Sequence, residues 1–260
     1  MHPILNTAIT AARLAGRITL MHLNRLDSIE VNSKGRQDFV TQVDLEAESI
    51  ILDTIRKTYP THAVLAEESG EQSGDEYTWI IDPLDGTTNF IHGYPSFGVS
   101  IAVQKGDQIE HGVIFDPLRD ELFVSTRGEG ARLNDRRIRV SHVQHLERSL
   151  LGTGFPFRAM ERIDPCIKTF RALLPKTSGI RRSGAASLDL AHVAAGRFDG
   201  FWEMSLKPWD MAAGVLLIRE AGGLVSDFDG EQHFLTSGNI VAANSALFNE
   251  LLRIVHDRSQ

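Results

Sequence analysis

Cysteine is almost absent from this chain, and its scarcity sets the first limits on function. A single cysteine, Cys166, stands among 260 residues, so no intramolecular disulfide can form. This usage is typical of a reducing compartment. The neighbouring Asp164 and Pro165 offer no base that would activate the thiol. We therefore interpret Cys166 as a buried or idle thiol and not as a nucleophile.

Long apolar runs and an excess of positive charge are also absent. No apolar run approaches the roughly 20 residues that span a bilayer, and the first 17 residues lack a signal-peptide pattern. We therefore predict a cytoplasmic protein that does not contact membranes. The chain has 27 Lys and Arg against 34 Asp and Glu, a net charge of −7. This balance argues against direct nucleic-acid binding and is compatible with a cation site.

Low-complexity segments, short repeats and Pro/Gly-rich linkers are absent as well, so the chain is organised by its alternating helix and strand patterns. The patterns predict the α/β fold class, with an α+β half at residues 1–142 and an α/β half at residues 143–260. We expect the two halves to pack tightly against each other.

Apolar spacing places the individual elements. A helical stripe begins at Ile4, and a second helix follows Thr41 with Leu45, Ile51, Leu52 and Ile55 facing inward. Further helices are predicted at residues 165–174, 186–195, 208–221 and 245–255. Short apolar runs predict strands at residues 63–66, 79–81, 99–103, 109–115, 121–126, 149–153, 179–182, 201–203, 225 and 240–241.

The most informative stretch is WIIDPLDGTTNF, from Trp79 to Phe90. It begins as an apolar strand and ends in Asp82 and Asp85, with the Leu84 carbonyl between them. Carboxylate and carbonyl oxygens are the ligands of hard divalent cations. The sequence contains no Cys/His cluster, which favours Mg²⁺ or Mn²⁺ over zinc.

Two further acids follow predicted elements. Glu67 comes directly after the strand at residues 63–66, and Asp210 lies in the first turn of a strongly apolar helix. Side chains at such element ends can converge on a crevice. Each acid alone is more often a turn residue or a helix N-terminal charge. By composition, Glu68 is equal to Glu67, and spacing does not choose between them.

The segment Gly86-Thr87-Thr88 supplies backbone and hydroxyl groups beside the acids. Glycine allows close approach of a ligand, and the N–H groups of Gly86 and Thr87 at a helix start would hold phosphate oxygens. The Thr87 hydroxyl could orient a water. Together with the acids, these groups predict a metal-dependent phosphatase.

These motifs resemble the signatures of the inositol monophosphatase family of Mg²⁺-dependent, lithium-sensitive phosphatases. The first signature corresponds to Trp79–Asn89, the second to Pro208–Gly214 with Glu220–Gly223, and the acidic motif to Glu67-Glu68-Ser69-Gly70. The resemblance covers essentially the whole chain and is closest to the bacterial SuhB type. It implies a layered αβαβα sandwich, two or three Mg²⁺ ions per site (Mn²⁺ being possible) and a homodimer.

The resemblance implies a role for each site residue. Glu67, Asp82 and the Leu84 carbonyl would bind the first metal, and Asp82, Asp85 and Asp210 the second. Thr87, paired with Asp44, would activate water, with Glu67 also holding water. The residues implied to contact the sugar are Asp85, Gly184, Ala185, Ala186 and Glu203, the last lying seven residues before Asp210.

Two segments depart from the family pattern. Gly154-Phe155-Pro156-Phe157-Arg158 replaces a Gly-Ser-Ser-Arg segment of animal relatives, so the serine contact is not expected. Lys34-Gly35-Arg36 falls in a family loop near the site, but its basic residue is offset by one position.

Alternative functions remain open at this point. The substrate could be another sugar or nucleotide phosphate, such as fructose bisphosphate or a nucleotide 3′-phosphate, although the chain is short for a fructose bisphosphatase. The SuhB type also implies association with NusA and RNA polymerase in ribosomal RNA antitermination. The basic pair Arg181-Arg182 could then serve a partner surface, against its simpler interpretation as a solvated or phosphate-facing pair.

Overall fold

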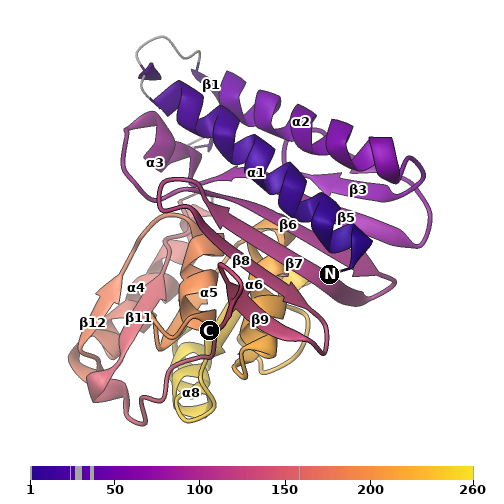
Figure 1. Ribbon diagram of the computed structural model, residues 1–260. Helices are drawn as coiled ribbons and strands as arrows, with labels where there is room; N and C mark the ends of the chain where they lie inside the picture. Colours follow the sequence, from indigo (N-terminus) through magenta and orange to yellow (C-terminus); the bar gives the residue numbers. More distant parts are fainter. Residues whose placement is uncertain (1, 24, 27–30, 36–37, 158, 260) are drawn as a thin grey trace.

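The protein is built of five layers in the order helices, sheet, helices, sheet, helices (Figure 1). This computed structural model describes residues 2–23, 25–26, 31–35, 38–157 and 159–259. The predicted αβαβα sandwich is confirmed. The helices of the three helical layers are α1 (Pro3–Leu23) and α2 (Gln42–Thr58), α5 (Ala186–Ala194) and α6 (Pro208–Glu220), and α4 (Ile163–Leu173) and α8 (Phe248–Ser259).

The first sheet has eight strands and places two carboxyl-terminal strand ends side by side. Its order is β10-β9-β8-β7-β6-β5-β3-β4. The pair β3 (Ala63–Ala66) and β5 (Tyr77–Asp85) is parallel, whereas the other neighbours are antiparallel. The remaining bounds are β4 (Gly70–Gln72), β6 (Gly98–Lys105), β7 (Gln108–Asp116), β8 (Glu121–Thr126), β9 (Gly130–Leu133) and β10 (Arg136–Arg137). Because β3 and β5 are parallel, Glu67 and the aspartates of β5 lie at one edge.

A bulge lies within β5 where the acidic motif begins. The register against β6 shifts between Asp82, which faces Ser100, and Asp85, which faces Gly98. A bulge bends a strand and redirects its side chains, and such irregularities are frequent beside active sites. The short helix α3 (Thr87–Ile91) follows at once.

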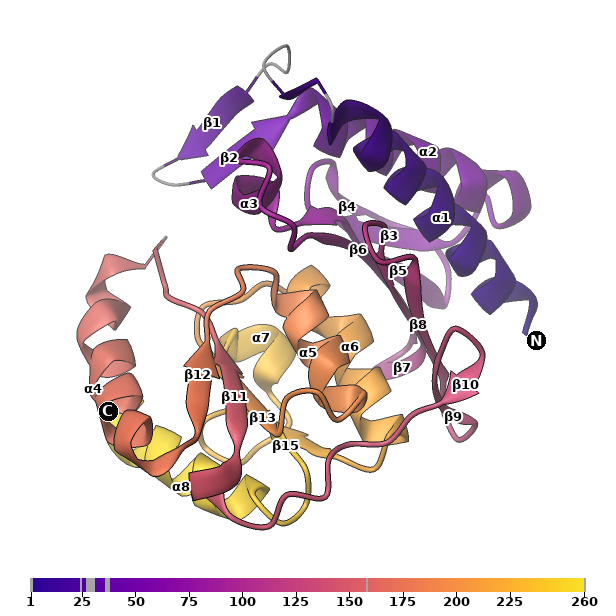
Figure 2. The same ribbon diagram turned by 60° about the vertical axis from the view of Figure 1, so that its left-hand side comes forward.

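The second sheet has five strands in the order β12-β11-β13-β15-β14. Strand β11 runs parallel to both β12 and β13, and β15 is antiparallel to its neighbours. The bounds are β11 (Leu150–Thr153), β12 (Gly179–Arg181), β13 (Gly200–Glu203), β14 (Leu224–Ser226) and β15 (Ile240–Ala243). Helices α4 and α8 lie beyond this sheet, away from the first one (Figure 2).

Helices α5 and α6 form a middle layer that both sheets cover. From Met211 to Ile218, every residue of α6 is buried, as expected for a helix with neighbours on all sides. One apolar core combines residues of both sheets and both helices, among them Ile80, Leu190 and Phe201. The predicted boundary near residue 142 falls in the segment between the last strand of the first sheet and the first strand of the second. The division into two halves stays a prediction, because one apolar core contains residues from before and after residue 142.

Four features differ from the sequence predictions. Leu45 was expected to face inward, but its exposed fraction is 52% because it lies on the outer face of α2. The final helix begins at Phe248, three residues later than predicted. The hairpin of β1 (Val31–Gly35) and β2 (Asp38–Thr41) was not predicted; Lys34 lies in β1, whereas Arg36 falls outside the described residues. A four-residue helix, α7 (Phe234–Ser237), was also missed.

Across the described residues, we find no helix with the length and apolarity that crossing a membrane requires.

Candidate active site

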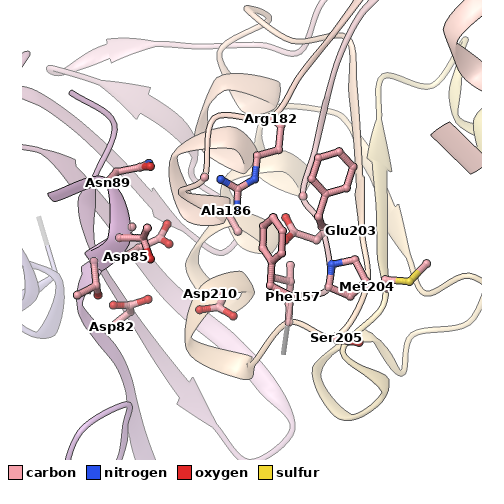
Figure 3. A pocket seen from close by; sticks show the side chains of 18 of the residues that line it. Asp82, Asp85, Asn89, Phe157, Arg182, Ala186, Glu203, Met204, Ser205 and Asp210 are labelled. Atoms are coloured by element: carbon pink, nitrogen blue, oxygen red, sulfur yellow. The ribbon is translucent and has the colours of Figure 1, made fainter. Parts of the chain in front are cut away.

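Three aspartates from distant parts of the chain converge at the edge of the first sheet. Carboxylate oxygens of Asp82, Asp85 and Asp210 all lie within 4.8 Å of one another. Glu67 lines the same pocket, whereas Glu68 does not. Figure 3 shows Asp82 and Asp85 on one side and Asp210 facing them from α6.

This convergence is electrostatically costly without a cation. Burial raises the pKa of Asp82 well above its usual range, and Glu67, Asp85 and Asp210 raise it further by repulsion. Burial and then Asp210 raise the pKa of Asp85 to about 7. Like charges held this close disfavour full ionisation. A bound divalent cation would relieve the repulsion.

Asp85 and Asp210 are both fixed by the starts of the middle-layer helices. Asp85 Oδ2 accepts the backbone N–H of Ser187 at 2.7 Å and the Ser187 hydroxyl at 2.5 Å, at the beginning of α5. Asp210 Oδ2 accepts the backbone N–H of Lys207 at 2.7 Å, which caps α6. No sequence pattern indicates the Ser187 contact, because it joins segments 102 residues apart.

The Thr87 hydroxyl meets Asp44, as the family resemblance implied. Thr87 Oγ1 donates to Asp44 Oδ1 at 2.9 Å and lies 3.1 Å from the Leu84 carbonyl oxygen. The other carboxylate oxygen, Asp44 Oδ2, accepts the backbone N–H of Thr41 at 2.8 Å and its hydroxyl at 2.6 Å. These bonds form a capping box at the start of α2, with Asp44 three residues after Thr41. Burial raises the pKa of Asp44 despite these donors.

Glu48, which the sequence analysis did not identify, holds the loop that contains Glu67. Its carboxylate accepts the backbone N–H groups of Glu68 at 2.9 Å and Ser69 at 2.8 Å, and its exposed fraction is 3%. Glu48 lies one helical turn after Asp44, on the same buried face of α2. The spacing of two acids at i and i+4 was the available signal.

Gly86 is the position where the motif requires glycine. Its φ is 90°, and a Cβ there would lie 2.8 Å from the Ser96 carbonyl oxygen. A side chain would therefore be both strained and obstructed. Next to it, the Asn89 amide donates to the carbonyls of Ser96 at 2.6 Å and Ser183 at 2.9 Å, which ties α3 to the segment before α5.

Apart from Asp85, the residues expected to contact the sugar belong to the second side of the pocket. Gly184, Ala186 and Glu203 line it, whereas Ala185 is fully buried and does not. Burial, then Asp189 and Asp210, raise the pKa of Glu203 well above its usual range. A Cβ at Gly154 would lie 1.8 Å from Glu203 Oε1, so glycine there leaves room for the carboxylate.

The rest of this side is an apolar wall that the sequence did not predict. Its members come from the loop after β11 and from the loop after β13: Phe155, Pro156, Phe157, Met204 and Leu206. The guanidinium of Arg182 lies 4.9 Å from the centre of the Phe157 ring.

The donor set of the pocket suits magnesium or manganese. Its described lining contains five acids, Glu67, Asp82, Asp85, Glu203 and Asp210, against one basic residue, Arg182, and includes no Cys or His. Carboxylate and carbonyl oxygens without nitrogen or sulfur ligands favour hard cations. With so many acids, a phosphate could enter only beside bound cations.

Comparison with known proteins agrees with this interpretation of the pocket. A family model described as the inositol monophosphatase family matches residues 1–260. The chain is 55% identical to the Nus factor SuhB of Pseudomonas aeruginosa, over 98% of this chain and 96% of that protein, and 50% identical to that of Escherichia coli K12, over 99% and 97%. Its fold superposes on the crystal structure of extragenic suppressor protein suhB from Bartonella henselae with a TM-score of 0.95, at 44% identity over 98% of both chains. For the Thermotoga maritima IMPase the TM-score is 0.90, at 36% identity over 98% of both chains. The chain therefore belongs to the inositol monophosphatase family.

Proposed function

We propose that this chain is a Mg²⁺-dependent phosphatase that hydrolyses myo-inositol 1-phosphate to myo-inositol and phosphate. The observation that supports this most is the convergence of Asp82, Asp85 and Asp210 within 4.8 Å in a pocket with one basic residue. Glu67, Asp82 and the Leu84 carbonyl would hold one Mg²⁺, and Asp82, Asp85 and Asp210 a second. When bound, such ions supply positive charge to the phosphate and lower the pKa of a water.

The protein groups would orient the water and the substrate. Thr87 donates its proton toward Asp44, so a lone pair of its hydroxyl is available to accept a hydrogen bond from the attacking water. The carboxylate of Glu67 lies in the same pocket and would hold that water from another side. The N–H groups of Gly86 and Thr87 would bind phosphate oxygens, and Glu203 would bind hydroxyls of the sugar ring beside Gly184 and Ala186.

No protein nucleophile takes part in this proposal. Burial, and then the nearby Glu203, raise the pKa of the Cys166 thiol to about 11, so the thiolate is scarce at neutral pH. Water attacks phosphorus in line and the alcohol leaves, without a phosphoenzyme. Covalent phosphate on the protein after quenching during turnover would contradict this mechanism.

The direct test is phosphate release from myo-inositol 1-phosphate, with and without Mg²⁺ and with added Li⁺. We expect release that depends on Mg²⁺ and falls with Li⁺. A panel with fructose 1,6-bisphosphate and a nucleotide 3′-phosphate ranks the alternative substrates by kcat/KM. Absence of Mg²⁺-dependent release from every ester would reject the phosphatase.

Asp82→Asn tests the site assignment. Asp82 would touch both ions, so its amide should abolish Mg²⁺-dependent turnover. The fold should remain intact, because the change removes one of several mutually repelling buried acids. Activity and circular dichroism of this variant and of the exposed control Asp53→Asn provide the measurement. Near wild-type hydrolysis by Asp82→Asn would contradict the assignment.

A second candidate function rests on the names of the relatives. Proteins at 55% and 50% identity over nearly the whole chain are Nus factors, so this chain could also join a transcription complex through NusA or RNA polymerase. Pull-down with purified NusA and RNA polymerase tests it, using the wild type and Asp82→Asn. Capture of both forms would separate this role from catalysis, and failure of both would reject it.

A further inference from the structure

The wall opposite the aspartates offers few hydrogen-bond partners to an alcohol. Its described side chains are apolar except for Glu203, Ser205 and Arg182. The amide of Asn89 is already committed to two backbone carbonyls. Hydroxyls placed against the apolar part would lose their water contacts without replacement, which is unfavourable. A polyol therefore fits beside Glu203, and the apolar surface next to Glu203 suits a different kind of group.

That surface presents the Phe157 ring and the Arg182 guanidinium, and other aromatic rings pack against it. Phe157 is exposed by 38%, and the planar guanidinium of Arg182 lies over its ring at 4.9 Å. Phe155 meets Phe157 edge to face, with ring centres 6.0 Å apart, and in turn packs on Phe170 of α4 with ring centres 6.1 Å apart. Figure 3 shows Arg182 and Phe157 next to Glu203, across the pocket from Asp82 and Asp85.

We propose that Phe157 and Arg182 form a leaving-group subsite that binds phosphomonoesters whose alcohol carries an aromatic ring. This inference rests on the proposed phosphatase function and adds a second class of substrate to the polyol phosphate that Glu203 would bind. The phosphate would lie at the aspartates, the first carbons of the alcohol beside Glu203, and the aromatic ring on the Phe157–Arg182 pair. Stacking on arginine and aromatic planes discriminates planar groups from saturated ones.

Two esters with similar alkyl leaving groups test the subsite, benzyl phosphate and glycerol 1-phosphate, each with Mg²⁺. In the wild type we expect a higher kcat/KM for benzyl phosphate. Phe157→Ala should lower kcat/KM for benzyl phosphate about tenfold more than for glycerol 1-phosphate, the size of one lost stacking contact. The loss should lie in KM, because stacking is equal in the ground and transition states.

Arg182→Lys keeps the positive charge but removes the planar guanidinium. It should therefore also lower kcat/KM for benzyl phosphate more than for glycerol 1-phosphate, by a smaller factor than Phe157→Ala. Met160→Ala is the matched control, because Met160 is similarly exposed, lies three residues from Phe157 and does not line the pocket. Equal losses for both esters, or no loss for benzyl phosphate, would overturn the subsite while leaving the phosphatase standing. Failure of the wild type with both esters and with inositol 1-phosphate would instead reject the phosphatase and the subsite together.

Discussion

Asp44 and Glu48 each position a different part of the proposed site. Asp44 receives the Thr87 hydroxyl, and Glu48 receives two backbone N–H groups of the loop that follows β3. Neither carboxylate lines the pocket; Asp44 fixes Thr87, which does, and Glu48 fixes the backbone directly after Glu67, which also does. Helix α2 therefore orients the ends of two strands through one buried face.

Glu48→Ala tests this role. It leaves two N–H groups of the loop without their acceptor, at a cost of about 1–3 kcal/mol each where water cannot replace it. Because Glu67 belongs to this loop, we expect the Mg²⁺ concentration for half-maximal activity to rise about tenfold, which corresponds to about 1.4 kcal/mol. Magnesium titration of the activity is the measurement.

Glu48→Gln and Asp53→Ala are the controls for that experiment. Glutamine keeps one carbonyl acceptor and should recover part of the magnesium affinity. Asp53 is exposed on the same helix, so its removal should leave the titration unchanged. An unchanged magnesium requirement in Glu48→Ala would show that the loop holds its geometry without this carboxylate.

Individual residues show which parts of the site can be predicted from the sequence. Acids directly after apolar strands were identified, because the chain itself places them at strand ends. Ser187, Glu48 and Phe157 were not assigned roles, because their contacts depend on how distant segments pack. Leu45 was assigned to the wrong face, since an apolar residue in a helix can also be exposed.

At the level of elements, the strongest patterns were predicted and the weakest were missed. Apolar strands such as β8 and the helices of the middle layer follow their sequence periodicity closely. The hairpin of β1 and β2 is largely polar, with VNSKG in its first strand, so no alternation marks it. Strand order and the bulge in β5 arise from pairing between strands, which local periodicity does not encode.

Close packing of α5 on α6 gives a prediction about Gly214. A Cβ there would lie 2.5 Å from the Cβ of Leu190. Alanine usually stabilises a helix relative to glycine by about 1 kcal/mol, but here it must push the helices apart. We expect Gly214→Ala to lower the free energy of unfolding by about 1–2 kcal/mol, as overpacking does. Urea denaturation measures it.

A second substitution, at Leu190, tests whether the contact between Gly214 and Leu190 causes that loss of stability. Leu190→Gly removes the Cβ that would lie 2.5 Å away, together with the rest of the side chain, and so makes space for the methyl group that Gly214→Ala adds. In that background, adding Gly214→Ala should be neutral or stabilising. If Gly214→Ala instead stabilises the wild-type protein, the helices accommodate the added methyl group without cost, and their close approach at Gly214 has no energetic role.

For the whole molecule, the site is assembled across the middle of the sandwich. The first sheet provides Asp82 and Asp85, and the segment beyond residue 142 provides Asp210 and Glu203. Hydrogen bonds cross the same region, from Ser187 to Asp85, from Asn89 to Ser183, and from the Ser100 hydroxyl to the Trp209 carbonyl at 3.0 Å. Global stability should therefore respond to the charge of the site.

The metal-free protein should lose stability as the pH rises from about 4 to 7. The pKa of Asp85 increases from 3.8 to about 7 on folding, so the folded state binds more protons than the unfolded chain in this range. The stability it contributes is fully present below pH 3.8 and is lost as the pH rises toward 7. Calorimetry in EDTA should give a lower Tm at pH 7.5 than at pH 5.5, by several degrees at about 2–4 °C per kcal/mol.

Added Mg²⁺ should reverse the order of the Tm values at pH 5.5 and pH 7.5. Ions bind the ionised carboxylates, so added Mg²⁺ should raise Tm more at pH 7.5 than at pH 5.5, and activity should fall in acid. The variant Asp85→Asn should show less of the pH dependence in EDTA. A Tm in EDTA that is higher at pH 7.5 than at pH 5.5 would mean that the repulsion among these acids does not limit stability.

The position of Asp210 on a separate helix has a consequence for ion size. Mg²⁺ requires ligands at about 2.0–2.1 Å in near-octahedral geometry, whereas Ca²⁺ accepts about 2.3–2.6 Å and looser arrangements. The distance from Asp210 to the aspartates of β5 is set by α6, which is buried from Met211 to Ile218, and not by a loop that could adjust. Discrimination between magnesium and calcium would therefore be a property of core packing, and changes in the middle layer far from the ligands would alter which ion the pocket accepts.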